Sequence, residues 1–188
     1  MIPTLPVPLR NRLTDVILAA LHDESARREL ARLADPSAPT ADWLSAEQEV
    51  HAASLRHRAR RAAEVLGPRP LGPPRPALAE TLAAAATLFD AGLHFEVHEL
   101  LEPHWREARG AAREALQGLV QVAVGYQHLA NRNLAGARAL LAEGVERLAV
   151  GSLPGIALEP FASAVRASLA QLHAVERIPV PRFPRQGE

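Results

Sequence analysis

The residues best suited to chemistry lie in the segment FDAGLHFEVHELLEPHW, residues 89–105. Within it, a His-Glu-x-x-Glu run is formed by His98, Glu99 and Glu102. Residues four apart are neighbours on one face of a helix, so His98 and Glu102 can reach the same ligand. Imidazole nitrogen and carboxylate oxygen are ligands that zinc and other divalent transition metals accept. The spacing is therefore typical of two ligands of a metal site, and His128 or Glu99 could supply the third.

The surroundings of this run are apolar. A helical wheel of residues 93–105 places His98 and Glu102 on one broad face together with Phe95, Leu101 and Trp105. Burying charge among such side chains costs several kcal/mol, of order ~3–5 when one partner is missing, unless the charge is paired or bound to a metal. The sequence therefore predicts that the polar side chains of this face have partners.

A second polar group lies on the next apolar segment, residues 111–130. Gln117, Gln121 and His128 are spaced by four and seven residues, which places them in one narrow stripe of a helix. Such a stripe is expected to face the polar face of the preceding helix. Gly118 and Gly125 would let the two helices approach closely.

Three interpretations of this groove remain open. It can hold a divalent metal ion on His98, Glu102 and His128, it can be a metal-free acid–base site, or it can be a His–Glu–Gln network that fixes helix register. The zinc-protease motif His-Glu-x-x-His is absent, and Glu-x-x-His, typical of ferritin-like di-iron proteins, does not occur. The sequence favours the network, including forms in which it shapes a groove for a partner.

Other histidines and a basic run are expected to have simpler roles. His94 is expected to be half-exposed or to join the network, and His104 to be a solvated surface residue. The run RHRARR, residues 56–61, could contact phosphates, but its helical spacing with apolar residues favours a solvated helix face.

The elements that position these residues are predicted to be helices. Apolar spacing predicts helical structure over 9–34 and 44–66, where Ser45 and Gln48 can form a capping box, and no alternation indicates a strand. Further helices are predicted over 77–90, closed by Gly92, and over 93–106, 111–130, 134–149 and 160–176. We expect an all-α fold in which a compact bundle of about five helices, residues 77–178, follows an N-terminal helical extension, residues 1–66. The Pro-rich stretch 67–76 would link them, and 179–188 would form an extended tail.

Composition narrows the function classes. The chain has 188 residues, a formal net charge of zero and no cysteine, so thiol catalysis and cysteine-ligated zinc are excluded. Every basic residue among the 21 is arginine, and balanced charge gives no general attraction to nucleic acid or membrane. No signal peptide or membrane-spanning run is evident, so a cytoplasmic location is expected.

The longer pattern resembles a known family, the domain of unknown function 309 family. The resemblance rests on a Phe-x-x-Gly…Glu-x-His-Glu-x-x-Glu-x-x-Trp run followed by a Gln-Gly-x-x-Gln helix, and it covers roughly residues 82–176. The matching residues are Phe89, Gly92, Phe95, Glu96, His98, Glu99, Glu102 and Trp105, then Gln117, Gly118, Gln121, His128, Gly136 and Ala137. The resemblance implies an all-helical fold and a site, but no reaction.

The chain departs from the family pattern in two places. Pro103 directly follows Glu102, and proline disfavours the α conformation at the residue before it. The family has an asparagine four residues after its histidine, whereas Asn131 and Asn133 stand three and five residues after His128. A kink that rotates Glu102 relative to His98 is therefore one expectation.

Taken together, the sequence favours a helical-bundle protein whose polar groove is structural or binds a protein or small-molecule partner. The alternative is a metal-dependent hydrolase, so the sequence leaves open whether the protein is an enzyme. A divalent metal ion is the one cofactor that the pattern suggests. Homo-oligomerisation stays open, and nucleic acid is the least favoured partner.

Overall fold

The computed structural model describes residues 5–172 and 178–187, and over these residues the chain is all-α, as predicted. The described residues hold eight α-helices in all, three before residue 77 and five after it; the bundle of about five helices was expected for residues 77–178 alone. Isolated bridges, Leu153 with Ile156 and Ile156 with Gln186, are the only β pairings within the described residues. None of the described helices is both long and apolar enough to cross a bilayer.

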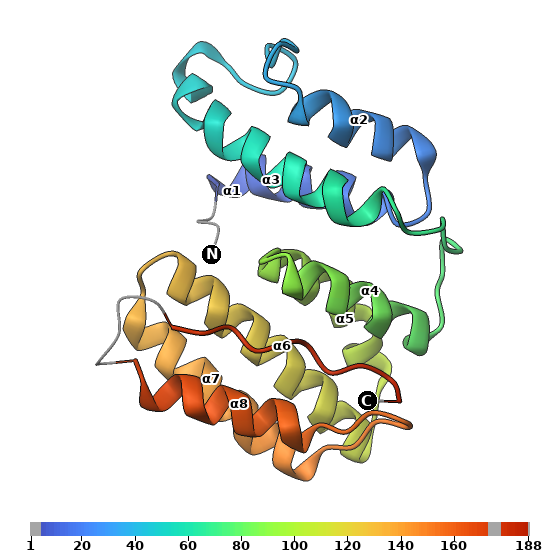
Figure 1. Cartoon of the computed structure of the whole chain (residues 1–188), viewed down its shortest axis with the longest axis vertical. Helices are drawn as coiled ribbons and strands as arrows, with labels where there is room; N and C mark the ends of the chain where they lie inside the picture. The colour runs from blue at the N-terminus through green and yellow to red at the C-terminus, as the bar shows by residue number, and fades with distance from the viewer. Residues whose placement is uncertain (1–4, 173–177, 188) are drawn as a thin grey trace. The chain divides into compact units, whose positions relative to one another are not determined.

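The chain divides into two compact units, residues 2–76 and residues 77–188. The N-terminal unit contains α1 (Val7–Ala19), α2 (Glu24–Ala34), a 3-10 helix, η1 (Ala46–His51), and α3 (Ala52–Leu66), which are drawn in blue to green in Figure 1. Asp23 caps α2, its carboxylate accepting a hydrogen bond from the Ser25 amide at 2.7 Å. The core is built from leucines spaced at helical intervals, among them Leu13, Leu30 and Leu55, all fully buried.

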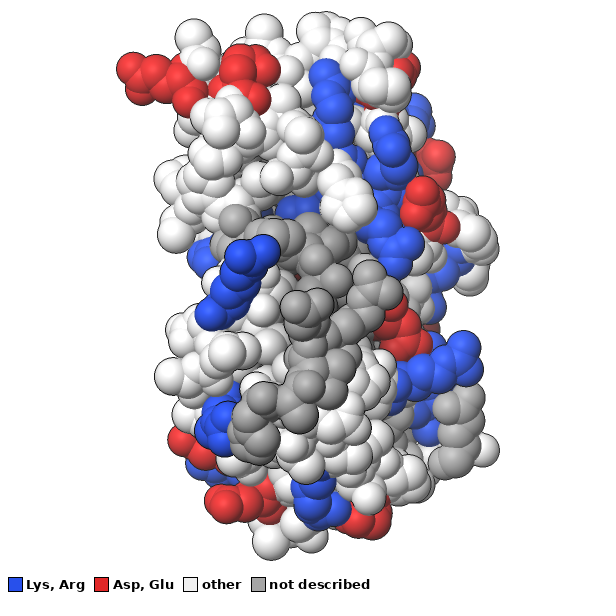
Figure 2. All heavy atoms as spheres, turned by 60° about the vertical axis from the view of Figure 1, so that its left-hand side comes forward, with Lys and Arg blue, Asp and Glu red and all other residues white. Residues whose placement is uncertain are grey.

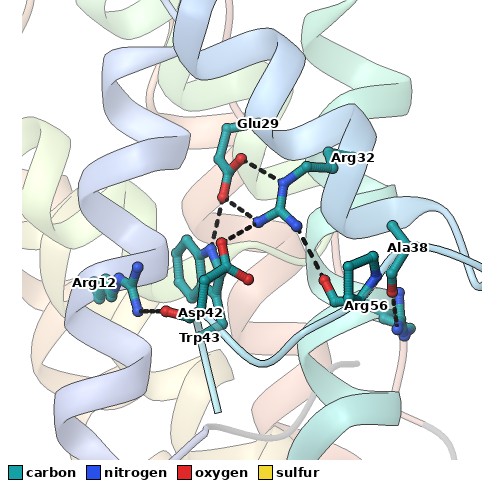
Figure 3. A network of polar contacts seen from close by, with 8 residues as sticks. Arg12, Glu29, Arg32, Ala38, Asp42, Trp43 and Arg56 are labelled. Carbon is teal, nitrogen blue, oxygen red and sulfur yellow. Dashed lines mark hydrogen bonds and ion pairs between the residues drawn. The ribbon is translucent and has the colours of Figure 1, made fainter.

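A polar network anchors the loop between α2 and η1 to the N-terminal unit (Figure 3). Glu29 accepts hydrogen bonds from Arg32 at 2.8 Å and from the Trp43 indole at 2.6 Å. Arg32 also pairs with Asp42 at 2.7 Å, and the Arg12 guanidinium lies 4.0 Å from the centre of the Trp43 ring. These bonds give a loop without regular structure a defined position.

The basic run of α3 contributes to packing on α2. Arg60 donates to the Ala34 carbonyl at 3.2 Å, and Arg56 donates to the carbonyls of Asp35 and, at 2.7 Å, Ala38. Carbonyls at a helix C-terminus lack intrahelical partners and carry partial negative charge, so guanidinium groups stabilise them. Figure 2 shows acidic side chains beside basic ones on the face drawn, in keeping with a formal net charge of zero.

The C-terminal unit contains α4 (Leu78–Asp90), α5 (His94–Glu107), α6 (Gly110–Ala130), α7 (Leu134–Val150) and α8 (Glu159–Ala170) (Figure 1). The last helix ends earlier than the predicted 160–176, and residues 173–176 lie outside the described part. Gly92, with φ of 76°, closes α4 as expected: its amide bonds to Phe89 O at 2.8 Å, and Leu93 N bonds to Leu88 O at 2.9 Å. This Schellman motif sets the direction in which α5 leaves.

Two glycines bring α6 and α7 into close contact. A Cβ at Gly118 would lie 2.9 Å from the Gly144 carbonyl oxygen, and one at Gly125 would lie 2.8 Å from the Leu141 side chain. The sequence predicted that these glycines would bring α6 close to the preceding helix, α5, but the atoms nearest to them belong to α7. Phe89 is fully buried in the core, with its ring centre 5.7 Å from Tyr126 and 5.8 Å from Phe161.

Candidate functional site

Helix α5 carries the His-Glu-x-x-Glu run on a partly exposed face. Val97 and Leu101, spaced by four, are fully buried and hold the adjoining side of the helix in the core. The side chains of His98, Glu99 and Glu102 keep 27%, 35% and 25% of their accessible surface. The run is therefore within reach of solvent.

Pro103 lies inside α5, and the helix continues through it to Glu107. Proline has no amide proton, so the Glu99 carbonyl cannot receive its usual bond from residue 103. The side chain of Glu102 nevertheless remains near His98, within one group of ligand atoms. The proline thus removes one backbone bond without separating the two side chains.

The three polar side chains gather into one cluster, which we call the α5 cluster (His98, Glu99 and Glu102). The Nδ1 atom of His98 lies 2.9 Å from Oε1 of Glu99, and Glu102 Oε1 accepts from Arg106 at 2.7 Å. One ligand atom from each residue lies within 4.8 Å of the others. Ligands bound to one zinc ion at ~2.1 Å are roughly 3.4–4.2 Å apart, so small side-chain rotations would bring these atoms to an ion.

His128, predicted as a metal ligand, stands in a different arrangement. Its Nδ1 atom lies 2.9 Å from Nδ2 of Asn133, the residue that caps α7. Asn133 Oδ1 accepts from the Gly136 amide at 2.9 Å, and a Cβ at Gly136 would lie 2.8 Å from Asn133 Nδ2. The structure therefore places His128 at the turn between α6 and α7, while Glu99 joins the α5 cluster.

The two glutamines of the predicted stripe remain on α6. Gln121 donates to Glu143 of α7 at 2.8 Å, and Gln117 is partly buried. The hydrogen bonds of Gln121 and His128 both lead toward α7, so these residues support the α6–α7 pair. The structure thus brings together three of the six predicted polar residues.

Two buried polar residues lie beside the cluster in sequence. His94 retains 1% of its surface and packs with its ring centre 4.9 Å from Phe89 and 5.7 Å from Tyr126. Of the two expectations for His94, the half-exposed one is wrong, because the Schellman turn directs the first residue of α5 into the aromatic core. Glu96 is completely buried. Tyr126, which packs against His94, is also fully buried, and this loss of water around its own hydroxyl raises the pKa of Tyr126 to about 12.

His104 and Trp105 connect α5 to its neighbours. His104 was expected to be solvated, but it is partly buried, with Nε2 2.9 Å from the Thr81 hydroxyl of α4. Arg113 of α6 lies over the Trp105 ring at 4.8 Å and donates to the Trp105 carbonyl at 3.1 Å. Partly buried Phe95, whose ring centre lies 6.0 Å from that of His98, flanks the α5 cluster.

Comparison with known proteins agrees with the resemblance seen in the sequence. The model of a domain of unknown function (DUF309) matches residues 82–140, which extend from α4 into α7 and include the whole α5 cluster. The predicted resemblance is confirmed over these residues. Searches of curated proteins and of solved structures gave no match.

Proposed function

We propose that the C-terminal unit is a binding module in which the α5 cluster takes up a divalent transition-metal ion. The single observation that carries the proposal is the convergence of one imidazole and two carboxylates within 4.8 Å on a partly exposed helix face. Mixed nitrogen and oxygen ligands suit zinc, manganese or ferrous iron better than calcium or magnesium, which prefer oxygen alone.

The bonds made by the cluster also support this proposal. The hydrogen bonds of His98, Glu99 and Glu102 given above all stay within α5, whereas those of Gln121 and His128 join α6 to α7. A link inside one helix contributes little to tertiary structure. Helix packing therefore explains the residue types of the α5 cluster less well than it explains those of Gln121 and His128.

Loading an ion requires little rearrangement. Glu102 must leave Arg106, an exposed partner with 70% of its side-chain surface accessible. Exposed ion pairs of this kind contribute only ~0–1 kcal/mol, so their loss is easily offset by a metal bond. His98 must turn a ring nitrogen from Glu99 toward the ion. Three protein ligands would then leave coordination positions for water.

Isothermal titration with Zn²⁺ and Mn²⁺ tests the proposal. The wild-type chain is expected to bind one ion, and His98→Ala or Glu102→Gln is expected to weaken binding at least ~10-fold through loss of one ligand. Glu107→Gln is the matched control, because Glu107 is an exposed carboxylate on the same helix outside the cluster. Equal binding by all four proteins would refute the proposed site.

A metal-dependent hydrolase is the second candidate. It is favoured by the same three-ligand set, because catalytic zinc sites combine three protein ligands with a bound water. Metal-loaded protein would be assayed with ester and phosphoester substrates beside His98→Ala. Turnover that requires both added metal and His98 would support hydrolysis. Metal binding without turnover would support only the binding module.

A further inference from the structure

The C-terminal segment, residues 178–187, lies extended along the C-terminal unit (Figure 1, dark red). It contains Pro179, Pro181 and Pro184, and proline-rich chains favour an extended conformation at low entropic cost. Phe183 keeps only 1% of its surface, and Pro184 is also buried. The segment is therefore held against the helices at Ile178, Phe183 and Pro184, while residues between and beyond them are partly or fully exposed.

The carboxylate of Asp90 binds both the backbone and a side chain of this segment. Asp90, the last residue of α4, accepts a hydrogen bond from the Phe183 amide at 3.0 Å through Oδ1. Its other oxygen, Oδ2, pairs with Arg185 at 2.5 Å. Both side chains of the pair are partly exposed, at 25% for Asp90 and 33% for Arg185. The pair is thus accessible at the surface.

An aromatic contact lies next to the carboxylate. The Phe183 ring centre is 5.2 Å from Phe89 of α4 and 5.7 Å from Phe161 of α8. Aromatic rings at such distances add ~0.5–1.5 kcal/mol beyond the burial of their surface. Phe183 is accordingly the main anchor of the segment, and Asp90 fixes its direction.

The ends of the segment are held by backbone contacts. At the N-terminal end, the Ser168 hydroxyl of α8 donates to the Pro179 carbonyl at 2.7 Å. At the other end, the Gly187 amide donates to the Gly155 carbonyl at 3.0 Å. An aromatic-lined surface that receives an extended, proline-rich chain is a recurring way in which domains bind peptides.

We propose that the surface formed by Asp90, Phe89 and Phe161 is a peptide-binding site that recognises an extended Phe-Pro-Arg sequence, filled in cis by residues 183–185. The binding groups come from α4 and α8, and Asp90 is 93 residues away from Phe183 in sequence. Recognition therefore depends on folded helices and not on local chain geometry. A covalently attached ligand has an effective concentration of ~mM, so the site accepts an external peptide only when the attached segment is released.

The test uses the full chain carrying Phe183→Ala and Arg185→Ala, which removes both anchors of the attached segment. The probe is a fluorescently labelled peptide, IPVPRFPRQG, with the sequence of residues 178–187, and binding is followed by anisotropy. The double variant is expected to bind the probe at least ~10-fold more tightly than the wild-type chain, because the attached competitor is gone. Two matched controls are a peptide of the same composition in scrambled order and the double variant with Asp90→Ala added.

Each outcome decides the proposal. Binding that is lost with Asp90→Ala and weakened roughly 10-fold when the probe lacks its Arg185 counterpart supports it. A double variant that keeps helical circular dichroism but binds the two peptides equally overturns it. If the double variant does not fold, the single Arg185→Ala chain replaces it. That chain keeps the core contact of Phe183 but loses the pair with Asp90, so its attached segment competes less strongly with the probe. Probe binding no tighter than that of the wild type would then overturn the proposal.

Discussion

Asn133→Ala tests the assignment of His128 to the turn between α6 and α7. Asn133 Oδ1 accepts the Gly136 amide proton, so Nδ2 is the atom that faces His128. An amide nitrogen donates, and the imidazole Nδ1 must therefore accept, with the ring proton on Nε2. Replacing Asn133 with alanine removes both the cap of α7 and the partner of the ring.

The magnitude follows from these two bonds. Loss of a helix N-cap costs about 1 kcal/mol, within ~0.5–2. Loss of a hydrogen bond to a partly exposed ring costs ~0.5–1 kcal/mol, because water can replace the asparagine. Asn133→Ala is therefore expected to lower the free energy of unfolding by roughly 1–2 kcal/mol, which corresponds to roughly 4–8 °C in Tm for a unit of this size.

Thermal unfolding can be followed in the C-terminal unit alone. The chain has two tryptophans, Trp43 and Trp105, and Trp43→Phe leaves only the one in α5. In that background Asn133→Asp is the matched control, because it keeps the oxygen acceptor and adds a charge favourable at a helix N-terminus. The added charge offsets the loss of the Nδ2 bond to His128, so this variant is expected to stay within ~0.5 kcal/mol of its parent. An unchanged Tm for Asn133→Ala, or equal losses for both variants, would contradict the reasoning.

Two further substitutions test packing and charge. Gly118→Ala places a Cβ 2.9 Å from the Gly144 carbonyl oxygen. The overpacking cost of ~1–3 kcal/mol should exceed the gain of about 1 kcal/mol in helix propensity. The variant is therefore expected to unfold at a lower urea concentration than the wild type, and a higher one would contradict the reasoning. Arg32 and, less strongly, Trp43 hold the pKa of Glu29 below its ordinary value of 4.5, against the opposing effect of burial. A lowered carboxyl pKa stabilises the fold above pH ~4.5, and that stability is lost as the pH falls through the lowered value. Unfolding followed by Trp43 fluorescence should therefore show that Glu29→Gln is less stable than the wild type near pH 7. The stability of the variant should also fall less than that of the wild type as the pH is lowered, and an equal fall in both proteins would refute this.

Much of the fold follows from patterns that the sequence displays. Apolar residues at helical spacing indicate an all-α chain, and Gly92 marks the end of α4 because its φ of 76° suits glycine. The proximity of His98 to Glu102 follows from the pitch of a helix alone. These predictions depend on local geometry, which a single segment determines.

The partner of each helix face could not be predicted in the same way. A helical wheel gives the direction of Gln121 and His128 around α6, but α6 packs against both α5 and α7. The structure directs the hydrogen bonds of both residues toward α7. Asn133 could have been recognised, since asparagine before an apolar run is a frequent N-cap. The contacts of Asp90 with the C-terminal segment are too distant in sequence for any local pattern to predict.

The basic run of α3 shows how tertiary packing decides between two uses of charge. The sequence expectation was a solvated helix face. The structure leaves Arg60 exposed but also gives Arg56 and Arg60 carbonyl partners at the end of α2 and in the loop that follows it. The folded unit determines which helix end a guanidinium can reach, so this contact cannot be predicted from composition.

Elemental analysis of the full chain shows whether the α5 cluster holds a metal ion. The untagged protein would be purified without chelators, beside His98→Ala. We expect close to one equivalent of a divalent transition metal in the wild type and a large loss of that metal in the variant. Metal absent from both proteins after incubation with excess Zn²⁺ and Mn²⁺ and removal of free ions, or retained equally by both, would contradict it.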